Sequence, residues 1–200
     1  MVDGKPLIII YHFHRLSNPK SFANLWREFC RKEGIGEIML LYAKNMLYSS
    51  NPSEHGFDGV FEFFPFMIVD YLHYVSHRHP PYEHSFTGKI LDHRDFVESK
   101  LYCSSEKCLV YKNVFPCWDN SPRYHNHAKL FHGCSPELYR QWLEDIIDYT
   151  KNHHKSKDKY VFVNAWNEWA EGAHLEPDRK YGYAYLAATR EAVLKNIWLK

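Results

Sequence analysis

Apolar residues along this chain fall into two alternating patterns: short, nearly continuous runs, and longer segments in which they recur every three or four positions. The short runs predict strands at 6–13, 37–42, 57–63, 109–114 and 160–165. Runs that are apolar at successive positions are typical of parallel strands whose two sheet faces are both covered. The sequence therefore predicts strands that are buried inside a layered structure.

Three helices are predicted from apolar residues at helical spacing. The first begins at Pro19 behind the Ser-Asn pair at 17–18, and the second begins at Pro136 behind Ser135, because Ser and Asn cap helices and Pro fits the first turn. The third runs over 183–197. The expected apolar faces are, in order, Phe22, Leu25, Trp26 and Phe29; then Leu138, Trp142, Leu143, Ile146 and Ile147; then Leu186, Ala187, Val193 and Leu194.

Strands and helices alternate, which predicts an α/β fold with a parallel sheet. The His- and Pro-rich stretch 70–95 has no clear period, and we predict a long loop with one helical turn there. In parallel α/β folds the functional residues lie just beyond the carboxyl ends of the strands. Two unusual polar segments lie at such positions: Trp-Asp-Asn at 118–120 and Asn-Glu-Trp-Ala-Glu at 167–171.

Length and charge narrow the class of protein. The 200 residues suffice for one domain, which we take to span 1–200. A formal net charge of +1 gives no electrostatic argument for nucleic acid or for an anionic membrane as a partner. Aromatic residues make up 17%, which fits either a Tyr-rich core and surface or aromatic platforms for the apolar faces of sugars.

The cysteines and the amino-terminal region bear on location. There are five cysteines, with no Cys-x-x-Cys spacing: Cys30, Cys103, Cys108, Cys117 and Cys134. An odd count in a chain with enough apolar residues for a core predicts reduced thiols. The apolar run 7–10 is too short for a secretion signal, and no run approaches membrane-spanning length. We therefore expect a cytoplasmic protein.

The strongest chemical signal is a pair of carboxylates, Glu168 and Glu171, three residues apart. If the chain turns there, both carboxylates face one point, whereas a continued strand would turn them to opposite sides. Two carboxylates at one site break or form glycosidic bonds, one as acid and the other as base or nucleophile. Aromatic and amide neighbours suited to sugar rings and hydroxyls flank the pair: Asn164, Trp166, Asn167 and Trp169. An ordinary capped loop with solvated Glu and packed Trp is the alternative.

Other polar groups offer weaker sites. His73 and His77 are spaced for one face of a helix, but no acidic residue completes a zinc motif and Pro80 follows closely, so we expect no metal. Asp119 and Arg123 either bind substrate or form a loop salt bridge. The chain has no Gly-rich phosphate loop and so no visible site for a sugar nucleotide, and we expect no cofactor.

These residues resemble a known family. The segment 164–178, Asn-Ala-Trp-Asn-Glu-Trp-Ala-Glu-Gly-Ala-His-Leu-Glu-Pro-Asp, followed by 181–186, closely resembles the signature of WbsX-type glycosyltransferases. That group is similar to the endo-α-mannosidase family of glycoside hydrolases, family ninety-nine. Further similarity at 5–11, 57–63 and 116–123 extends the resemblance over nearly the whole chain.

The resemblance implies a (β/α)8 barrel and an enzyme of bacterial polysaccharide, specifically O-antigen or lipopolysaccharide, biosynthesis. It implies that Glu168 and Glu171 are catalytic, acting by general acid/base chemistry with assistance from the sugar's own 2-hydroxyl. The expected substrate contacts are Trp118, Asp119, Asn120, Arg123, Asn164, Trp166, Asn167 and Trp169.

Two departures from the family qualify these expectations. The chain begins in what corresponds to the middle of the barrel, and about five strands cannot close an eight-stranded barrel. We expect a partial barrel that lacks its amino-terminal strands and that pairs with the missing half or with itself. Cys117 stands where Gly is expected, and His12 stands where a different basic residue is usual. Three functions stay open: glycosyl transfer or hydrolysis, non-catalytic glycan binding by a degenerate barrel, and metal-dependent hydrolysis.

Overall fold

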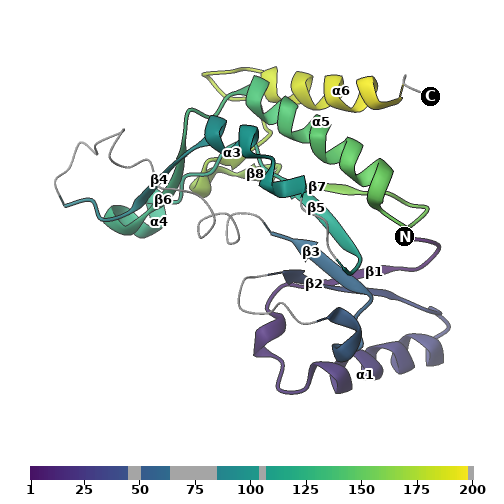
Figure 1. The fold of residues 1–200 in the computed structure, drawn as a ribbon. Coiled ribbons are helices and arrows are strands. Elements are labelled where there is room, and N and C mark those ends of the chain that lie inside the picture. Colours follow the sequence, from purple (N-terminus) through teal and green to yellow (C-terminus); the bar gives the residue numbers. More distant parts are fainter. Residues whose placement is uncertain (45–50, 64–84, 104–106, 198–200) are drawn as a thin grey trace.

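A five-stranded parallel sheet with the order β1-β2-β3-β5-β7 forms the centre of the molecule and curls into half a barrel (Figure 1). The computed structural model describes residues 1–44, 51–63, 85–103 and 107–197. The strands are β1 (Leu7–Ile10), β2 (Met39–Lys44), β3 (Gly59–Glu62), β5 (Val110–Val114) and β7 (Val161–Val163). All neighbours in this order are parallel, so the predicted α/β sheet is confirmed, with each strand within a few residues of its expected place.

Three long helices cover the sheet: α1 (Pro19–Lys32), α5 (Pro136–His153) and α6 (Ala184–Ile197). Figure 1 shows α1 beside the first strands, with α5 and α6 side by side at the opposite end of the molecule. The predicted caps are confirmed, since Asn18 accepts a hydrogen bond from the Ser21 N–H and Ser135 from the Leu138 N–H. Among the described residues, no helix is long and apolar enough to cross a membrane.

Smaller elements lie at the edge of the half-barrel where the strands end. They are the parallel pair β4 (Lys89–Asp92) and β6 (Lys129–His132), the antiparallel pair β8 (Asn167–Glu168) and β9 (Ala173–His174), and the short helices α3 (His93–Ser99) and α4 (Ser121–Tyr124). Single 3-10 turns complete the chain at Phe13–Arg15, Pro52–His55, Leu101–Cys103, His125–His127 and Trp169–Glu171.

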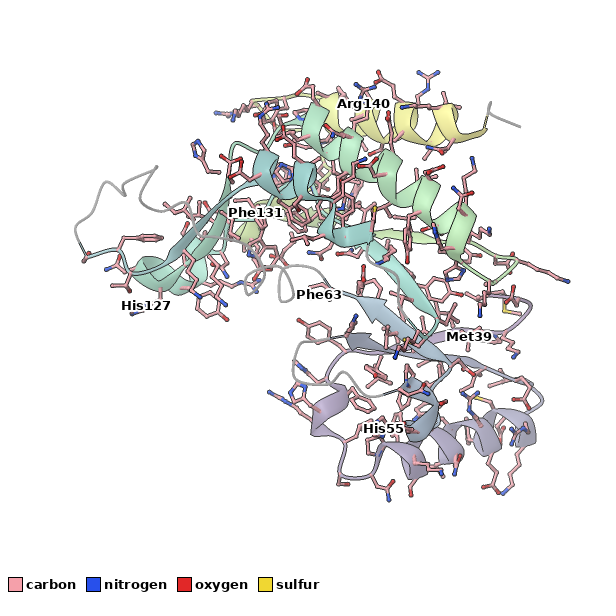
Figure 2. The ribbon with its side chains drawn as sticks, viewed as in Figure 1. Met39, His55, Phe63, His127, Phe131 and Arg140 are labelled. Carbon is pink, nitrogen blue, oxygen red and sulfur yellow. A yellow bond between two sulfur atoms is a disulfide. The ribbon has the colours of Figure 1, made fainter. Side chains whose placement is uncertain are left out.

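The core is divided among separate layers. The largest cluster lies between β5, α3, α5 and α6 and is rich in aromatic rings, among them Phe96, Phe115 and Trp142. Figure 2 shows Phe131, a member of this cluster, in the dense packing near α3. A second cluster, which includes Leu40 and Phe57, joins α1 to the first strands.

The predicted loop over 70–95 was wrong in its last part. Residues 89–92 form β4, and α3 begins at His93, while residues 70–84 lie outside the described residues. The Asp92 carboxylate caps α3 by accepting hydrogen bonds from the backbone N–H groups of Arg94 and Asp95. A four-residue strand is too short for its periodicity to be recognised, but the Asp cap was visible in the sequence.

Two of the predicted apolar helix faces were wrong in part, although Phe22 and Leu186 pack against the buried clusters as predicted. On α1, Leu25, Trp26 and Phe29 are exposed, and Ala23 and Cys30 are buried instead. On α6, Val193 and Leu194 are exposed, and the buried residues are Tyr185, Ala188 and Ala192. In both helices small Ala side chains mark the contact, because they let the helix approach its neighbour closely. A Cβ added to Gly56 would lie 3.0 Å from the Cβ of Ala23.

The prediction of five reduced cysteines was wrong for two of them. Cys117 and Cys134 form a disulfide with their Cα atoms 5.6 Å apart, and the other three cysteines are not disulfide-bonded. Cys117 follows β5 and Cys134 follows β6. The two cysteines meet because β6 brings Cys134 back beside the loop that follows β5. The spacing of the cysteines in the sequence does not reveal this path of the chain.

Candidate functional site

Polar and aromatic residues from several strands meet at the carboxyl edge of the curled sheet. Tyr11 follows β1, Phe63 follows β3, the segment 118–123 follows β5, and the segment 164–172 follows β7. Tyr11 and Phe63 touch edge to face, with ring centroids 5.3 Å apart. Because all five strands are parallel, these segments share one edge, where parallel α/β folds place their functional residues.

The chain turns sharply between the two predicted carboxylates. Glu168 ends β8, a 3-10 turn covers Trp169–Glu171, and Gly172 takes a left-handed conformation with φ of 62° before β9 returns antiparallel to β8. This conformation favours Gly. The turn is the geometry that the paired-carboxylate hypothesis requires.

Both carboxylates bind the same guanidinium. Arg123 donates one hydrogen bond of 2.9 Å to Glu171 and one of 3.1 Å to Glu168. The Glu171 side chain is 13% exposed and that of Glu168 is 36% exposed. Burial raises the pKa of Glu171, the Arg123 charge opposes this shift, and the nearby Glu168 carboxylate adds to it. The two acids thus share a partner but differ in their access to solvent.

The segment after β5 fixes the position of Arg123. The Asp119 carboxylate accepts a hydrogen bond from the Ser121 N–H and so starts the α4 turn, while the Asp119 N–H donates to the backbone oxygen of Glu171. The Asn120 side chain is buried and accepts a hydrogen bond from the Lys129 N–H. Through these hydrogen bonds Asp119 connects the segment after β5 to the segment 164–172, and Asn120 connects it to β6. Arg123 forms its salt bridges with Glu168 and Glu171, and these differ from the loop salt bridge of Asp119 with Arg123 that the sequence offered as the alternative to substrate binding.

The tryptophans of the site differ in exposure. Trp118 is 4% exposed and belongs to the largest core cluster, so it has no open face for a sugar. Trp166 and Trp169 are 53% and 49% exposed. These two rings are therefore aromatic surfaces that a ligand can reach beside the carboxylates.

The two asparagines lie on either side of Trp166. The Asn164 N–H donates to the Val114 oxygen and continues the contact between β7 and β5. Asn167 is exposed in β8, opposite His174. Of the two, Asn167 presents its side chain to solvent.

Sequence reasoning missed Tyr11. Its pKa is raised by partial burial and by the negative charge of Glu171, which places its phenol in the electrostatic field of the carboxylate pair. The signal was present in the sequence, because Tyr11 directly follows the first predicted strand. The rule that functional residues follow strand ends applies to that strand as much as to the fourth and fifth.

The histidine-rich segments bear on the predicted absence of a metal. His73, His77 and His79 lie outside the described residues. Within the described part of the chain, no group of three or more His, Cys, Asp or Glu side chains is placed to hold a metal ion, and this part includes His125, His127 and His132.

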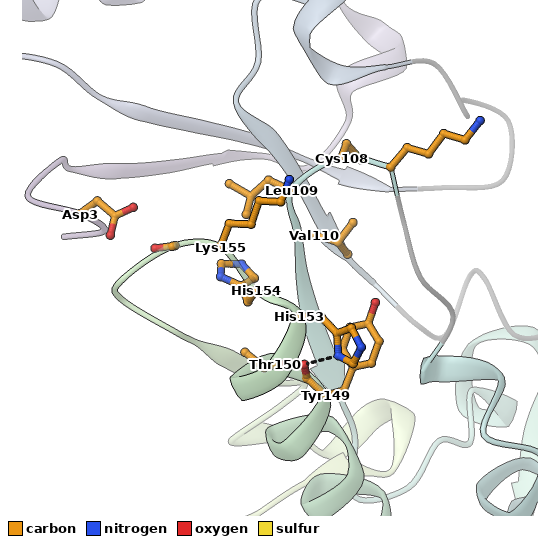
Figure 3. A pocket seen from close by; sticks show the side chains of 11 residues that line it. Asp3, Cys108, Leu109, Val110, Tyr149, Thr150, His153, His154 and Lys155 are labelled. Atoms are coloured by element: carbon orange, nitrogen blue, oxygen red, sulfur yellow. Dashed lines mark hydrogen bonds between the residues drawn. The ribbon is translucent and has the colours of Figure 1, made fainter.

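A cavity of about 440 Å³ lies at the other end of the sheet, between the start of β5 and the end of α5 (Figure 3). Its lining includes Asp3, Leu109 and His154 and none of the predicted site residues. In barrels the amino-terminal ends of the strands serve stability and the carboxyl ends serve chemistry. The carboxylate site is therefore the better candidate.

The curled parallel sheet, with the candidate site at its carboxyl edge, defines an α/β protein of half-barrel form. The family model described as "Glycosyltransferase WbsX" matches residues 1–189. The chain belongs to the WbsX glycosyltransferase family.

Two curated relatives come from strains of Xanthomonas campestris pv. campestris, and both are named "Uncharacterized protein WxcX". They are 38% and 37% identical over 194 residues, which is 97% of this chain and 28% of each relative. The chain thus spans just over a quarter of their length. A solved structure described as "Glycoside hydrolase-like protein" superposes with a TM-score of 0.59 at 15% identity, covering 96% of this chain and 55% of that one. This likeness concerns the fold.

Proposed function

We propose that this chain supplies the catalytic carboxylates of an enzyme that cleaves or transfers glycosyl units, with Glu171 as the general acid and Glu168 as the base or nucleophile. The observation that carries the proposal is the shared guanidinium, since Arg123 contacts both carboxylates and so brings them to one point. Two carboxylates around one anomeric carbon are the usual equipment for this chemistry. Family membership supports the same conclusion.

The difference in burial between Glu171 and Glu168 supports this division of roles. Burial raises the pKa of Glu171, so this carboxyl keeps its proton closer to neutral pH, as a general acid must. Glu171 then protonates the leaving glycosidic oxygen. Glu168 is more exposed and accepts the proton of the attacking group, which is a water, an acceptor hydroxyl or, as in the hydrolases that the chain resembles, the sugar's own 2-hydroxyl.

The same carboxylates serve transfer and hydrolysis, because the two reactions differ in whether a sugar hydroxyl or water receives the glycosyl unit. A glycan donor also needs no phosphate-binding loop. The WbsX family supports a bacterial surface polysaccharide, such as the O-antigen of lipopolysaccharide, as the substrate or product. In this scheme Trp166 and Trp169 stack on sugar rings, and Asn164 and Asn167 bind hydroxyls.

We further propose that residues 1–200 form a single domain of a (β/α)8 barrel, completed by further strands of a longer chain or by a second copy. The support is the sheet order, in which β1 and β7 are the outer strands of the described sheet. A cytoplasmic location stays a prediction. Thiol buffers in that compartment would keep Cys117 and Cys134 reduced.

Substitution of each carboxylate tests the catalytic proposal. We expect Glu168→Gln and Glu171→Gln each to lower turnover of α-mannan or purified bacterial surface polysaccharide by orders of magnitude, with an unchanged circular dichroism spectrum. Wild-type turnover in either variant removes that residue from the mechanism.

A non-catalytic glycan-binding protein is the second candidate, favoured by the two exposed tryptophans beside the site. Calorimetry on the double Gln variant separates the two. A wild type that binds the polysaccharide without turnover, and a double variant that binds equally well, would support the binding protein.

A further inference from the structure

Trp169 lies between the two carboxylates in sequence and is held from two directions. One face of its indole stacks on the His174 imidazole, with centroids 3.7 Å apart and planes 15° from parallel. Its edge is tied as well, because the indole N–H donates a 2.6 Å hydrogen bond to the Glu176 carboxylate. The ring thus has a partner on one face and another at its edge, yet half of its surface is open to solvent.

The groups that hold Trp169 are themselves anchored. His174 Nδ1 lies 3.3 Å from the backbone oxygen of Glu176, and its Nε2 lies 4.0 Å from the Asp178 carboxylate. Asp178 in turn accepts hydrogen bonds from the backbone N–H groups of Lys180 and Tyr181. The His174 side chain is only 15% exposed. A continuous set of contacts therefore runs from the turn at 178–181 to the Trp169 ring.

Trp166 provides a contrast on the same segment. Its ring is as exposed as that of Trp169, but within the described ranges no aromatic or imidazole ring stacks on it. The backbone oxygen of Trp166 accepts hydrogen bonds from Leu175 and Glu176, which fixes its main chain and not its ring. An exposed side chain without a packed face loses rotamer freedom when a ligand binds, and a ring that is already fixed loses little.

We propose that His174 and Glu176 are positioning residues that hold Trp169 as a fixed platform with one open face, on which a sugar ring of the glycan stacks beside the carboxylate pair. The proposal rests on the proposed function. It adds two residues that act on the substrate through Trp169, and it predicts that Trp169 contributes more to glycan binding than Trp166 does. The chemical basis is the apolar face of a pyranose ring against an aromatic face.

Ring order is tested first, without a ligand. In protein labelled with 5-fluorotryptophan, the ¹⁹F resonance of Trp169, assigned with Trp169→Phe, should shift and change its line width in His174→Ala and return toward wild type in His174→Phe, which restores a flat stacking partner. Glu176→Gln, which keeps an acceptor, should have a smaller effect than Glu176→Ala. His153→Ala is the matched control, because His153 stacks on Tyr149 at 4.4 Å far from the carboxylates. A Trp169 resonance that is unchanged in His174→Ala overturns the positioning role.

Glycan binding is tested second, by calorimetry with α-mannan oligosaccharides on the Glu171→Gln background, so that turnover does not interfere. We expect Trp169→Ala and His174→Ala to weaken binding about three- to tenfold, Trp166→Ala to weaken it less, and His174→Phe to restore it. In the active protein these variants should raise KM more than they lower kcat. Normal binding by Trp169→Ala overturns the platform. Loss of turnover in Glu168→Gln and Glu171→Gln is a separate result, so either proposal can fail alone.

Discussion

Arg123 neutralises one of the two negative charges of the carboxylate pair and sets where both carboxylates lie. We expect Arg123→Gln to lower turnover about ten- to a hundredfold, because small displacements of catalytic groups are costly. The substitution also removes a charge that lowers the pKa of Glu171, so this pKa should rise. The alkaline limb of the kcat/KM profile, where the acid loses its proton, should then move to higher pH.

The control for this prediction lies on α5. Arg140 pairs with Glu144 on the helix surface, and Arg140→Gln removes a comparable exposed charge outside the site. It should leave the pH profile unchanged. An alkaline limb that stays in place in Arg123→Gln would show that Arg123 does not tune Glu171, and a rise in KM alone would return it to a substrate-binding role.

His93 is fully buried among the rings of Phe96, Phe115, Phe131 and Trp142. Burial lowers its pKa from 6.5 to about 4. Above pH 6.5 the residue is neutral in both states. Between about pH 6.5 and 4, His93 is protonated in the unfolded chain and neutral in the folded protein. The free energy of unfolding therefore decreases as the pH falls through this window, by about 3 kcal/mol in total.

Urea unfolding at pH 7 and pH 4.5 measures this effect. His93→Phe should flatten the dependence in that window, although the larger ring lowers stability at both pH values by a similar amount. The exposed His132, replaced by Gln, serves as the control and should keep the wild-type dependence. An unaltered pH dependence in His93→Phe would remove His93 as the cause.

At the scale of single residues, the sequence indicated which residues have chemistry suited to a site, but not which side chains contact one another in the fold. Glu168, Glu171 and Trp169 were recognisable because they follow an apolar run together. The contact of Arg123 with both carboxylates was not, because 45 or more residues separate them and the loop after β5 has to fold back over the end of β7. Trp118 looked equivalent to Trp169, and only packing against the core distinguishes them.

At the scale of elements, the disulfide ties the loop after β5 to the start of α5. It closes a loop with a sequence separation of 17, for which chain entropy predicts a stabilisation of about 3 kcal/mol. We expect Cys134→Ser to lower the midpoint of guanidinium unfolding accordingly. Dithiothreitol should lower the unfolding midpoint of the wild type to about that of Cys134→Ser, and it should have no effect on the midpoint of Cys134→Ser. A reductant effect that persists in Cys134→Ser would assign the effect to other cysteines.

Element boundaries were easier to predict than element faces. The start of a helix depends on nearby residues, namely caps such as Asn18 and Ser135, whose side chains accept hydrogen bonds from the first turn of the same helix. Which face is buried depends on the neighbour. Ala188 and Ala192 of α6 are buried because small residues allow close approach to α5, whereas a pattern that weighs only hydrophobicity selects Val193 and Leu194.

At the scale of the whole molecule, the parallel sheet followed from the strand periodicity, but its extent did not. Each strand of the central sheet is recognisable as an apolar run, and the alternation of strands with helices predicts that neighbouring strands are parallel. The number of strands in a sheet depends on segments far away in the sequence, and the local pattern of apolar residues does not predict which of them join it. The side layer built from β4 and β6 was missed for a related reason, since each strand has only four residues.

An exposed apolar stripe on α1 bears on the association of the whole chain. Leu25, Trp26 and Phe29 are each at least 38% exposed, and β1 and β7 are the outer strands of the sheet that the described residues form. Exposed apolar surface and open edges both promote association. We therefore expect the chain to self-associate, with an average mass that rises with concentration in light scattering.

Two variants locate the surface responsible for association. Leu25→Lys with Phe29→Glu places opposite charges four residues apart on the stripe and should shift the chain toward monomer, without a large change in helix content. Asn24→Lys adds a charge to the same helix outside the stripe and should leave association as in the wild type. If the double variant associates as before, the sheet edges are the surface to test next. A wild type that stays monomeric over a hundredfold range of concentration would contradict the prediction as a whole.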